Sequence, residues 1–376
     1  MRVRKPYNYF LMVHKHARPR GAQARAPEMV KLEARDNMAQ SLLGIDIGMD
    51  NVKIVHRDHG LNFVTRRLPE NVVNDEGIVS PQVMAEFLKT LRAEEGIRAR
   101  DCSLVLAERG AFFRHVSLPP MSVSELKINL PFEFRDYISE DPEGYAFDYA
   151  LDNMVEDEEG KPTRMELFAA AARKETLNTY AEILKRAGFR LKVACPAPMA
   201  NMHLMHAHNV EHPEDSGNGT VLVDIGYRSM YISLFEGDRF MGSRMVEAGC
   251  YDVDCAIADL KAVDPHVAGT YREKNFEGVL ETEQCGAVFD RLLFEISKVV
   301  NFYNFSNPET EIRNIYLSGG GAGIDQLVVS IATNFDYPVW LVNSLMPDEA
   351  RANAKAAVCY LAYAGLIAGE ASVNGN

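Results

Sequence analysis

The chain carries Leu43-Gly44-Ile45-Asp46-Ile47-Gly48-Met49-Asp50-Asn51-Val52-Lys53-Ile54, and this stretch decides the fold because it returns later in the sequence. The second copy is Val221-Leu222-Val223-Asp224-Ile225-Gly226-Tyr227-Arg228-Ser229-Met230-Tyr231-Ile232. In both copies a β-branched run ends in Asp-Ile-Gly, three variable residues follow, and a second extended run returns. This pattern predicts a strand, a tight glycine turn and a returning strand. Two such hairpins predict a chain built from two related halves.

The sequence around the hairpins divides into further parts. Ser122 and Glu125 form a capping box, which predicts the start of a helix. Two extended runs follow it, joined by an acidic turn, and a helix over residues 174–187 comes next. The predicted parts are a basic, disordered extension (1–37), a first subdomain (38–118, completed by a segment near 197–215 and the C-terminal helix), an inserted α+β subdomain (119–196), a second half (216–369, mainly helical near 250–300) and a polar tail (370–376).

Composition narrows the range of partners. The 376 residues carry a net charge of −13, and the sequence pI is about 5.3. An acidic chain is not steered toward the phosphates of nucleic acids, so we expect protein or small-molecule partners. The longest apolar stretch, residues 356–369, is shorter than the roughly 20 residues that cross a bilayer. We therefore expect no membrane span, and for the basic residues 1–37 a lipid-binding arm is the alternative to a dispensable extension.

Neither the cysteines nor the histidines of the sequence form a recognisable metal site. The six cysteines form no C-x-x-C pair, which is typical of reduced thiols. His203, His206 and His208 are expected on the surface of a helix, because no carboxylate or cysteine shares their spacing.

Three strand ends marked by glycine favour a nucleotide site. One Asp-Ile-Gly alone is explained by a strand that ends in a turn. The chain has two, and a third strand over residues 314–318 ends in Gly319-Gly320-Gly321-Ala322. Turn amides can donate to phosphate oxygens, Asp46 and Asp224 can hold Mg²⁺ through water, and the glycine run permits close approach to an adenosine at a helix start.

The three segments resemble the phosphate-1, phosphate-2 and adenosine motifs of the actin, Hsp70 and sugar-kinase superfamily. Within it the chain resembles the type IV pilus assembly protein PilM family, to which FtsA is related. Further similarity covers roughly residues 41–369 and lies in Leu118-Pro119-Pro120-Met121, Leu184-Lys185-Arg186-Ala187-Gly188-Phe189, Glu295-Ile296-Ser297, Asn301-Phe302-Tyr303 and Leu317-Ser318-Gly319-Gly320-Gly321-Ala322. The resemblance implies an α/β, actin-like (ribonuclease H-like, duplicated) ATPase fold with a subdomain inserted in the first half.

The resemblance also implies a function. The chain would be a cytoplasmic scaffold of pilus or related secretion assembly that binds ATP and Mg²⁺, with at most weak ATPase activity. It would hold the cytoplasmic tail of a PilN-like membrane protein in a groove near the inserted subdomain, bind other pilus assembly proteins, and so lie at the inner face of the membrane; self-association is left open. Asp46 and Asp224 would position the metal and water, and the nucleotide would contact Gly48, Met49, Asp50, Asn51, Lys53, Gly226, Tyr227, Arg228, Ser229, Gly249, Gly319, Gly320, Gly321 and Ala322.

Three departures from the family pattern keep other readings open. Asp50 replaces a small hydroxyl residue and brings a like charge toward phosphates, which Arg228 is a candidate to offset. Tyr227 adds bulk to the second turn, and Gly249 is the only glycine where the family has a pair. These changes favour a nucleotide-free adaptor as one alternative. An FtsA-like cytoskeletal protein would bring a C-terminal amphipathic helix, and a small-molecule kinase would need a base carboxylate that no motif identifies.

Overall fold

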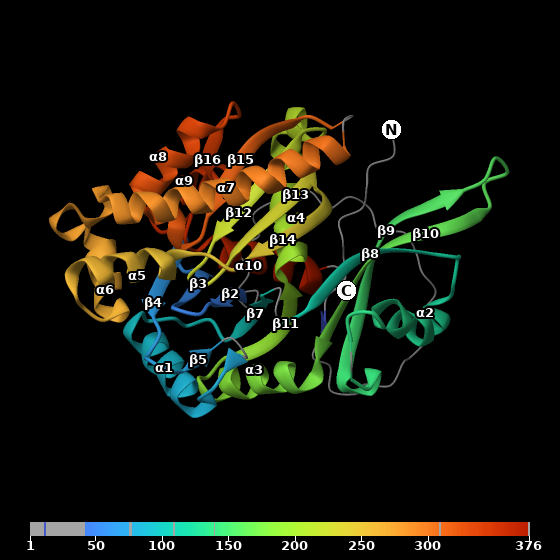
Figure 1. Cartoon of the computed structure of the whole chain (residues 1–376). Coiled ribbons are helices and arrows are strands. Elements are labelled where there is room, and N and C mark those ends of the chain that lie inside the picture. Colours follow the sequence, from blue (N-terminus) through green and yellow to red (C-terminus); the bar gives the residue numbers. More distant parts are fainter. Residues whose placement is uncertain are drawn as a thin grey trace.

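The fold is built around two larger β-sheets of the same design, together with a three-stranded sheet and a small two-stranded one. The computed structural model (Figure 1) describes residues 11–12, 42–74, 77–107, 110–138, 140–307 and 310–374. The predicted basic extension therefore lies outside the described residues, apart from β1 (Leu11–Met12), which pairs antiparallel with β11 (Arg190–Pro196).

The first sheet has the strand order β1-β11-β7-β2-β3-β4. Its remaining strands are β2 (Leu42–Ile47), β3 (Asn51–Arg57), β4 (Leu61–Arg67) and β7 (Asp101–Leu106). The strands β2, β3 and β4 pair antiparallel in sequence, whereas β7 joins β2 and β11 joins β7 in parallel. Every residue of β2 and of β7 is buried, as expected for central strands that are covered on both faces.

The second sheet repeats this plan, in the order β14-β13-β12-β15-β16. Its strands are β12 (Gly219–Ile225), β13 (Met230–Glu236), β14 (Arg239–Val246), β15 (Ile312–Ser318) and β16 (Val339–Leu341). The antiparallel and parallel pairings follow in the same succession. Register is also shared, because Asp46 pairs with Lys53 and Asp224 pairs with Tyr231. The predicted duplication is confirmed in strand order and in register.

The inserted unit has its own three-stranded sheet, β8-β10-β9. Its elements are β8 (Phe112–Leu118), α2 (Val123–Asn129), the 3-10 helices η1 (Leu130–Phe134) and η2 (Pro142–Gly144), β9 (Tyr145–Glu156) and β10 (Pro162–Arg173). The capping box at Ser122 is present in full. In Figure 1, β9 and β10 project from the rest of the chain as a long hairpin.

The sheets place the boundaries of this unit differently from the sequence. The strand β8 precedes residue 119 but pairs with β10, while α3 (Lys174–Arg186) packs on α1 (Pro81–Glu94) and β11 belongs to the first sheet. Which strands belong to the inserted unit is decided by pairing between strands that are distant in sequence. A linear sequence pattern does not reveal this pairing.

Two helices lie between the sheets and join the halves. The helix α10 (Tyr360–Asn374) packs on β2 and β7, and α4 (Ala197–Glu211) packs on α10, β11 and β14. Because α4 is central, His203 and His208 are buried, so the expectation that they lie on a helix surface was wrong. The helix α10 runs into the predicted polar tail, where Ser372 is buried.

The second half carries most of the other helices. They are α5 (Cys250–Lys261), α6 (Pro265–Lys274), η4 (Phe276–Glu281), α7 (Glu283–Ser306), η5 (Gly320–Gly323), α8 (Asp325–Asn334), η6 (Val342–Leu345) and α9 (Asp348–Arg351). Short pieces elsewhere are β5 (Val73–Asn74), β6 (Gly77–Ile78) and η3 (Pro213–Asp215). Among the described residues, no helix combines the length and the apolar character needed to cross a membrane.

The inserted unit also rests on the second half. The ring of Phe113 on β8 stacks on Phe168 of β10 at 5.7 Å and meets Phe240 of β14 edge-on at 5.5 Å. Phe240 in turn contacts Phe235 of β13 at 5.7 Å. This aromatic seat, made of Phe113, Phe168, Phe235 and Phe240, ties the insert to the hairpin that leaves the second glycine turn.

Candidate functional site

A cleft of about 1150 Å³ lies between the two halves, where β2, β12 and β15 end. The carboxyl ends of adjacent parallel strands meet at one edge of a sheet, which is where ligands of α/β proteins bind. The cleft is lined by Asp46, Asp224 and all the predicted nucleotide contacts except Gly249, Gly321 and Ala322.

The two turns at the strand ends have the same hydrogen bond. The amide of Gly48 donates to the carbonyl of Asn51 at 2.9 Å, and the amide of Gly226 donates to the carbonyl of Ser229 at 3.0 Å. Each turn therefore projects into the cleft as a tight loop directly after a strand carboxylate. The duplicated sequence becomes a pair of similar loops that line one space.

Lys53 lies between the two strand-end carboxylates. Its Nζ donates to Oδ2 of Asp46 at 2.8 Å. Burial alone would lower the pKa of Lys53, but the charge and hydrogen bond of Asp46 and the charge of Asp224 raise it above its usual value. The ammonium group is thus held charged in the cleft.

Asp224 has an unusual environment for a carboxylate. Burial raises its pKa to about 6, against the opposing effect of the Lys53 ammonium. Burial also raises the pKa of Tyr360, so its hydroxyl stays protonated beside Asp224. A half-buried carboxylate with a shifted pKa in a cleft is a mark of a functional site.

These two carboxylates fit a phosphate-bound Mg²⁺. Oxygen donors are the ligands that Mg²⁺ prefers, and it commonly keeps several waters while one or two carboxylates and the phosphates hold it. The described residues contain no cluster of three or more acidic, histidine or cysteine side chains around one point. A metal here would therefore depend on the nucleotide and on water for most of its ligands.

The first turn compensates for its extra charge in an unexpected way. Oδ1 of Asp50 accepts a hydrogen bond from Nε of Arg67 at 3.1 Å, and Oδ2 of Asp50 accepts one from the side-chain Nδ2 of Asn51 at 2.8 Å. The candidate for this role was Arg228, and that hypothesis was wrong. The guanidinium of Arg228 lies 3.4 Å from the ring centre of Tyr251, where stacking on an aromatic face stabilises it.

Gly249 supports the second turn from behind. The residues that follow it start α5, and the amides of Cys250 and Tyr251 donate to the carbonyls of Gly226 and Tyr227 at 3.0 and 2.8 Å. Gly249 is not among the residues that line the cleft, and its contact with a nucleotide stays a prediction.

The glycine run after β15 closes the third side of the cleft. Gly319 has a φ of 76°, and a Cβ at this position would lie 2.3 Å from Oδ1 of Asp224. Gly321 and Ala322 are buried, and a Cβ on Gly321 would meet the side chain of Ile225. Gly319 and Gly320 line the cleft, and the two residues after them support it.

Sequence reasoning missed several cleft residues, chiefly Arg67, Arg272 and Tyr360. The pairing of β3 with β4 could have indicated Arg67, because this residue lies opposite Asn51 of the first turn across the two antiparallel strands. Arg272 and Tyr360 reach the cleft from helices far along the chain, and no local pattern points to them.

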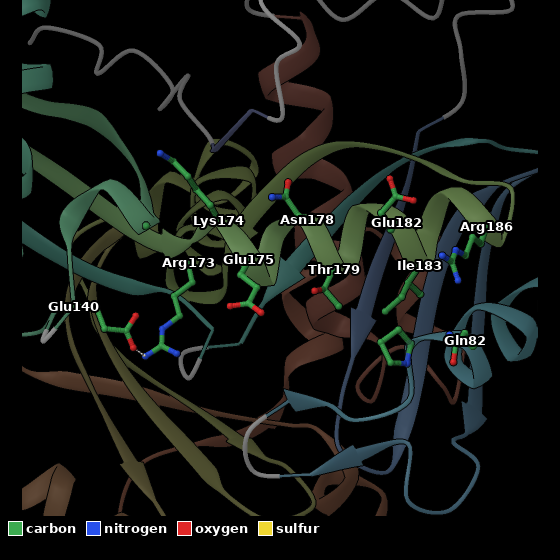
Figure 2. Close-up of a pocket in the computed structure, with 12 residues that line it drawn as sticks. Gln82, Glu140, Arg173, Lys174, Glu175, Asn178, Thr179, Glu182, Ile183 and Arg186 are labelled. Atoms are coloured by element: carbon green, nitrogen blue, oxygen red, sulfur yellow. Dashed lines mark ion pairs between the residues drawn. The ribbon is translucent and has the colours of Figure 1, made fainter.

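A second groove, of about 620 Å³, lies where the insert meets the first half (Figure 2). The helix α3 forms one wall, and η2 and the start of α1 complete it. An ion pair between Arg173 and Glu140, at 3.0 Å, stands at one end. The lining side chains are mostly polar and of both charges, with Lys174, Arg186, Glu175 and Glu182 along α3.

Comparison with known proteins identifies a family and a fold. The model of the family described as "Type IV pilus assembly protein PilM" matches residues 44–359. No curated protein matches the chain.

Solved structures show the same fold, among them the following two. The chain resembles a protein in a structure of the PilM-PilN type IV pilus biogenesis complex, with a TM-score of 0.72 and 20% identity over 88% of this chain and 98% of that one. It also resembles the ethanolamine utilization protein EutJ from Carboxydothermus hydrogenoformans, with a TM-score of 0.54 and 12% identity over 89% and 91% of the chains. The architecture is that of the actin-like ATPases.

Proposed function

Because the chain belongs to the type IV pilus assembly protein PilM family, we propose that it is a scaffold of pilus assembly that binds ATP between its halves and a membrane protein's tail beside its insert. The observation that carries the first part is the pair of loops, equal in register, that line one cleft with Asp46 and Asp224 at their bases. Two such loops offer amides for phosphates from both sides.

Different residues of the cleft would bind different parts of the nucleotide and its metal ion. The turn amides near Gly48 and Gly226 would donate to phosphate oxygens, and Lys53 would supply a positive charge. Asp46 and Asp224 would hold Mg²⁺ through water, and the backbone at Gly319 and Gly320 would approach the adenosine. Mg²⁺, when bound, neutralises phosphate charge. We expect hydrolysis to be weak at most, because Lys53 already neutralises Asp46.

Calorimetric titration with ATP and Mg²⁺ tests this part. We expect micromolar binding to the wild-type chain and at least a tenfold loss in Asp224→Asn, a change in charge with little change in shape. Asp290→Asn, on the exposed face of α7, is the matched control and should bind normally. If the wild-type chain gives no heat and no thermal shift up to millimolar ATP, it is an adaptor that works without nucleotide.

The second part concerns the partner. A related protein is known from a PilM-PilN complex, and the groove in Figure 2 lies beside the insert, near which we expect a PilN-like tail from the family resemblance. We therefore place that tail along α3, with its charged residues facing Lys174, Arg186, Glu175 and Glu182. The chain would then be held at the cytoplasmic face of the membrane by its partner.

A groove-filling variant tests the placement. Asn178 lines the groove on α3 and does not line the cleft, so Asn178→Trp should weaken binding of a PilN-like N-terminal peptide at least tenfold in an anisotropy titration. Thr333→Trp, on the exposed end of α8, is the control. Equal affinity of both variants for the peptide would move the tail to another surface.

A further inference from the structure

Arg67 leaves the first half and contacts the second. It is the last residue of β4, and its Nε pairs with Asp50 within its own half. Its Nη1 donates to the carbonyl of His266, in the first turn of α6, at 3.3 Å. Glu70 makes a second crossing, with an oxygen 3.5 Å from Nε2 of His266. The end of β4 is therefore joined to α6 at the cleft, and Figure 1 shows these elements side by side.

The helix α6 has a glycine, Gly269, where it faces the guanidinium of Arg67, and the missing side chain leaves room for that group. A Cβ on Gly269 would stand 2.8 Å from Nη2 of Arg67 and 3.1 Å from Oδ2 of Asp254. These two atoms carry opposite charge and lie on either side of the same point. Both are buried, and neither has a hydrogen-bond partner among the described residues. Unsatisfied buried polar atoms are costly, so a small approach that joins them is favourable.

The two atoms mark a gap in a row of alternating charges. Asp50 pairs with Arg67 in the first half, and Arg272 donates to Oδ1 of Asp254 at 2.6 Å in the second. The side chain of Asp254 is fully buried and that of Arg272 is nearly so. In this row of four charges only the link between Arg67 and Asp254 is unmade, and it would join the two ion pairs across the cleft.

We propose that Arg67 is a positioning residue that closes the cleft, pairing with Asp254 when the halves approach each other around a nucleotide. Closure then completes the row of charges and slows release of the nucleotide. The inference rests on the proposed binding of ATP. It assigns Arg67, Gly269 and Asp254 a shared role that the phosphate loops do not supply.

Gly269→Ala is the sharpest test, because the added methyl group would stand between the two charges and remove neither. Gly286→Ala is its matched control: it is another helical glycine of the second half, and a Cβ there meets nothing within 4 Å. Arg67→Lys keeps the charge but lacks the planar fork. We expect Gly269→Ala and Arg67→Lys each to speed dissociation of a fluorescent ATP analogue at least tenfold, and Gly286→Ala to leave it unchanged.

The double variant separates this role from a merely structural one. If both changes break the same contact, Gly269→Ala with Arg67→Lys should release nucleotide no faster than either alone. Additive effects, or single variants that release nucleotide at the wild-type rate, would overturn the proposal and leave ATP binding intact. Absence of nucleotide binding to the wild-type chain would instead overturn the proposed function. The role assigned to Arg67 would fall with it, because the contact between Arg67 and Asp254 forms only when the halves close around a nucleotide.

Discussion

Lys53 lies 2.8 Å from Asp46, and the same ammonium group acts on Asp224, which stands at the equivalent position of the other half. One cation therefore serves two carboxylates that come from duplicated strands. The arrangement neutralises the cleft only partly, and it leaves Asp224 with a pKa of about 6. Both features have consequences that can be measured.

Asp224→Asn should stabilise the chain at neutral pH. A carboxyl group whose pKa rises from about 3.9 in the unfolded chain to about 6 in the folded one binds its proton more tightly when folded, so its contribution to stability falls as the pH rises from about 4 to 6. Above pH 6 the ionised group costs at most about 3 kcal/mol. Urea unfolding should show the variant to be about 1–3 kcal/mol more stable than wild type at pH 7 and equal to it near pH 4. A variant that is less stable at pH 7 would contradict the unfavourable burial of this charge.

Lys53→Met should raise the affinity of the empty cleft for Mg²⁺. The change removes the cation that lies on Asp46 and leaves both carboxylates to a metal. We expect an affinity at least about tenfold higher than that of the wild-type chain, equivalent to 1.4 kcal/mol, measured as the dependence of thermal unfolding on Mg²⁺. Lys89→Met, an exposed change on α1, controls for loss of surface charge. A response equal to that of the control would show that the carboxylates do not act together on a cation.

Phe240→Ala should loosen the insert. Phe240 contacts both Phe113 and Phe235, so its loss removes the centre of the aromatic seat. We expect a loss of about 1–3 kcal/mol in the free energy of unfolding and faster proteolysis within the β9–β10 hairpin. Phe305→Ala is the control, since this ring on α7 is 88% exposed, and its effect should stay within about 0.5 kcal/mol. Equal effects would mean that the seat contributes no more than a surface residue.

Local signals predicted much of the fold. The β-branched runs and the turn glycines predicted both hairpins, and the capping box at Ser122 predicted the start of α2. The boundaries of the insert were predicted wrongly. The helix α3 and the strand β11 were assigned to the insert, but α3 packs on α1 and β11 joins the first sheet. Strand partners are chosen by burial against elements far along the chain, so a linear pattern cannot assign them.

Site residues that lie within one sequence motif could be predicted. Site residues contributed by other elements could not. Asp46, Asp224 and the turn residues share one motif, and the structure brings them to one cleft. The partner of Asp50 was assigned to Arg228, the nearest cation of the second motif, but Arg67 fills the role from the next strand. Arg67 reaches Asp50 because β4 pairs with β3 in a register that sets Arg67 opposite Asn51. The sequence alone does not give that register.

Gly319→Ala should abolish nucleotide binding, because two separate constraints meet at this residue. Its φ of 76° favours glycine, and a Cβ would lie 2.3 Å from Oδ1 of Asp224 and 2.6 Å from the carbonyl of Ile225. The carboxylate would have to move from its place at the end of β12, so both the loop and the proposed metal position would be lost. We expect a fall of at least about 2 kcal/mol in the free energy of unfolding together with loss of ATP binding in calorimetry. Gly323→Ala is the matched control, since this glycine also lines the cleft, is exposed and has nothing within 4 Å of an added Cβ. If Gly319→Ala bound ATP as well as Gly323→Ala does, the close approach of the glycine run to Asp224 would have no part in the site.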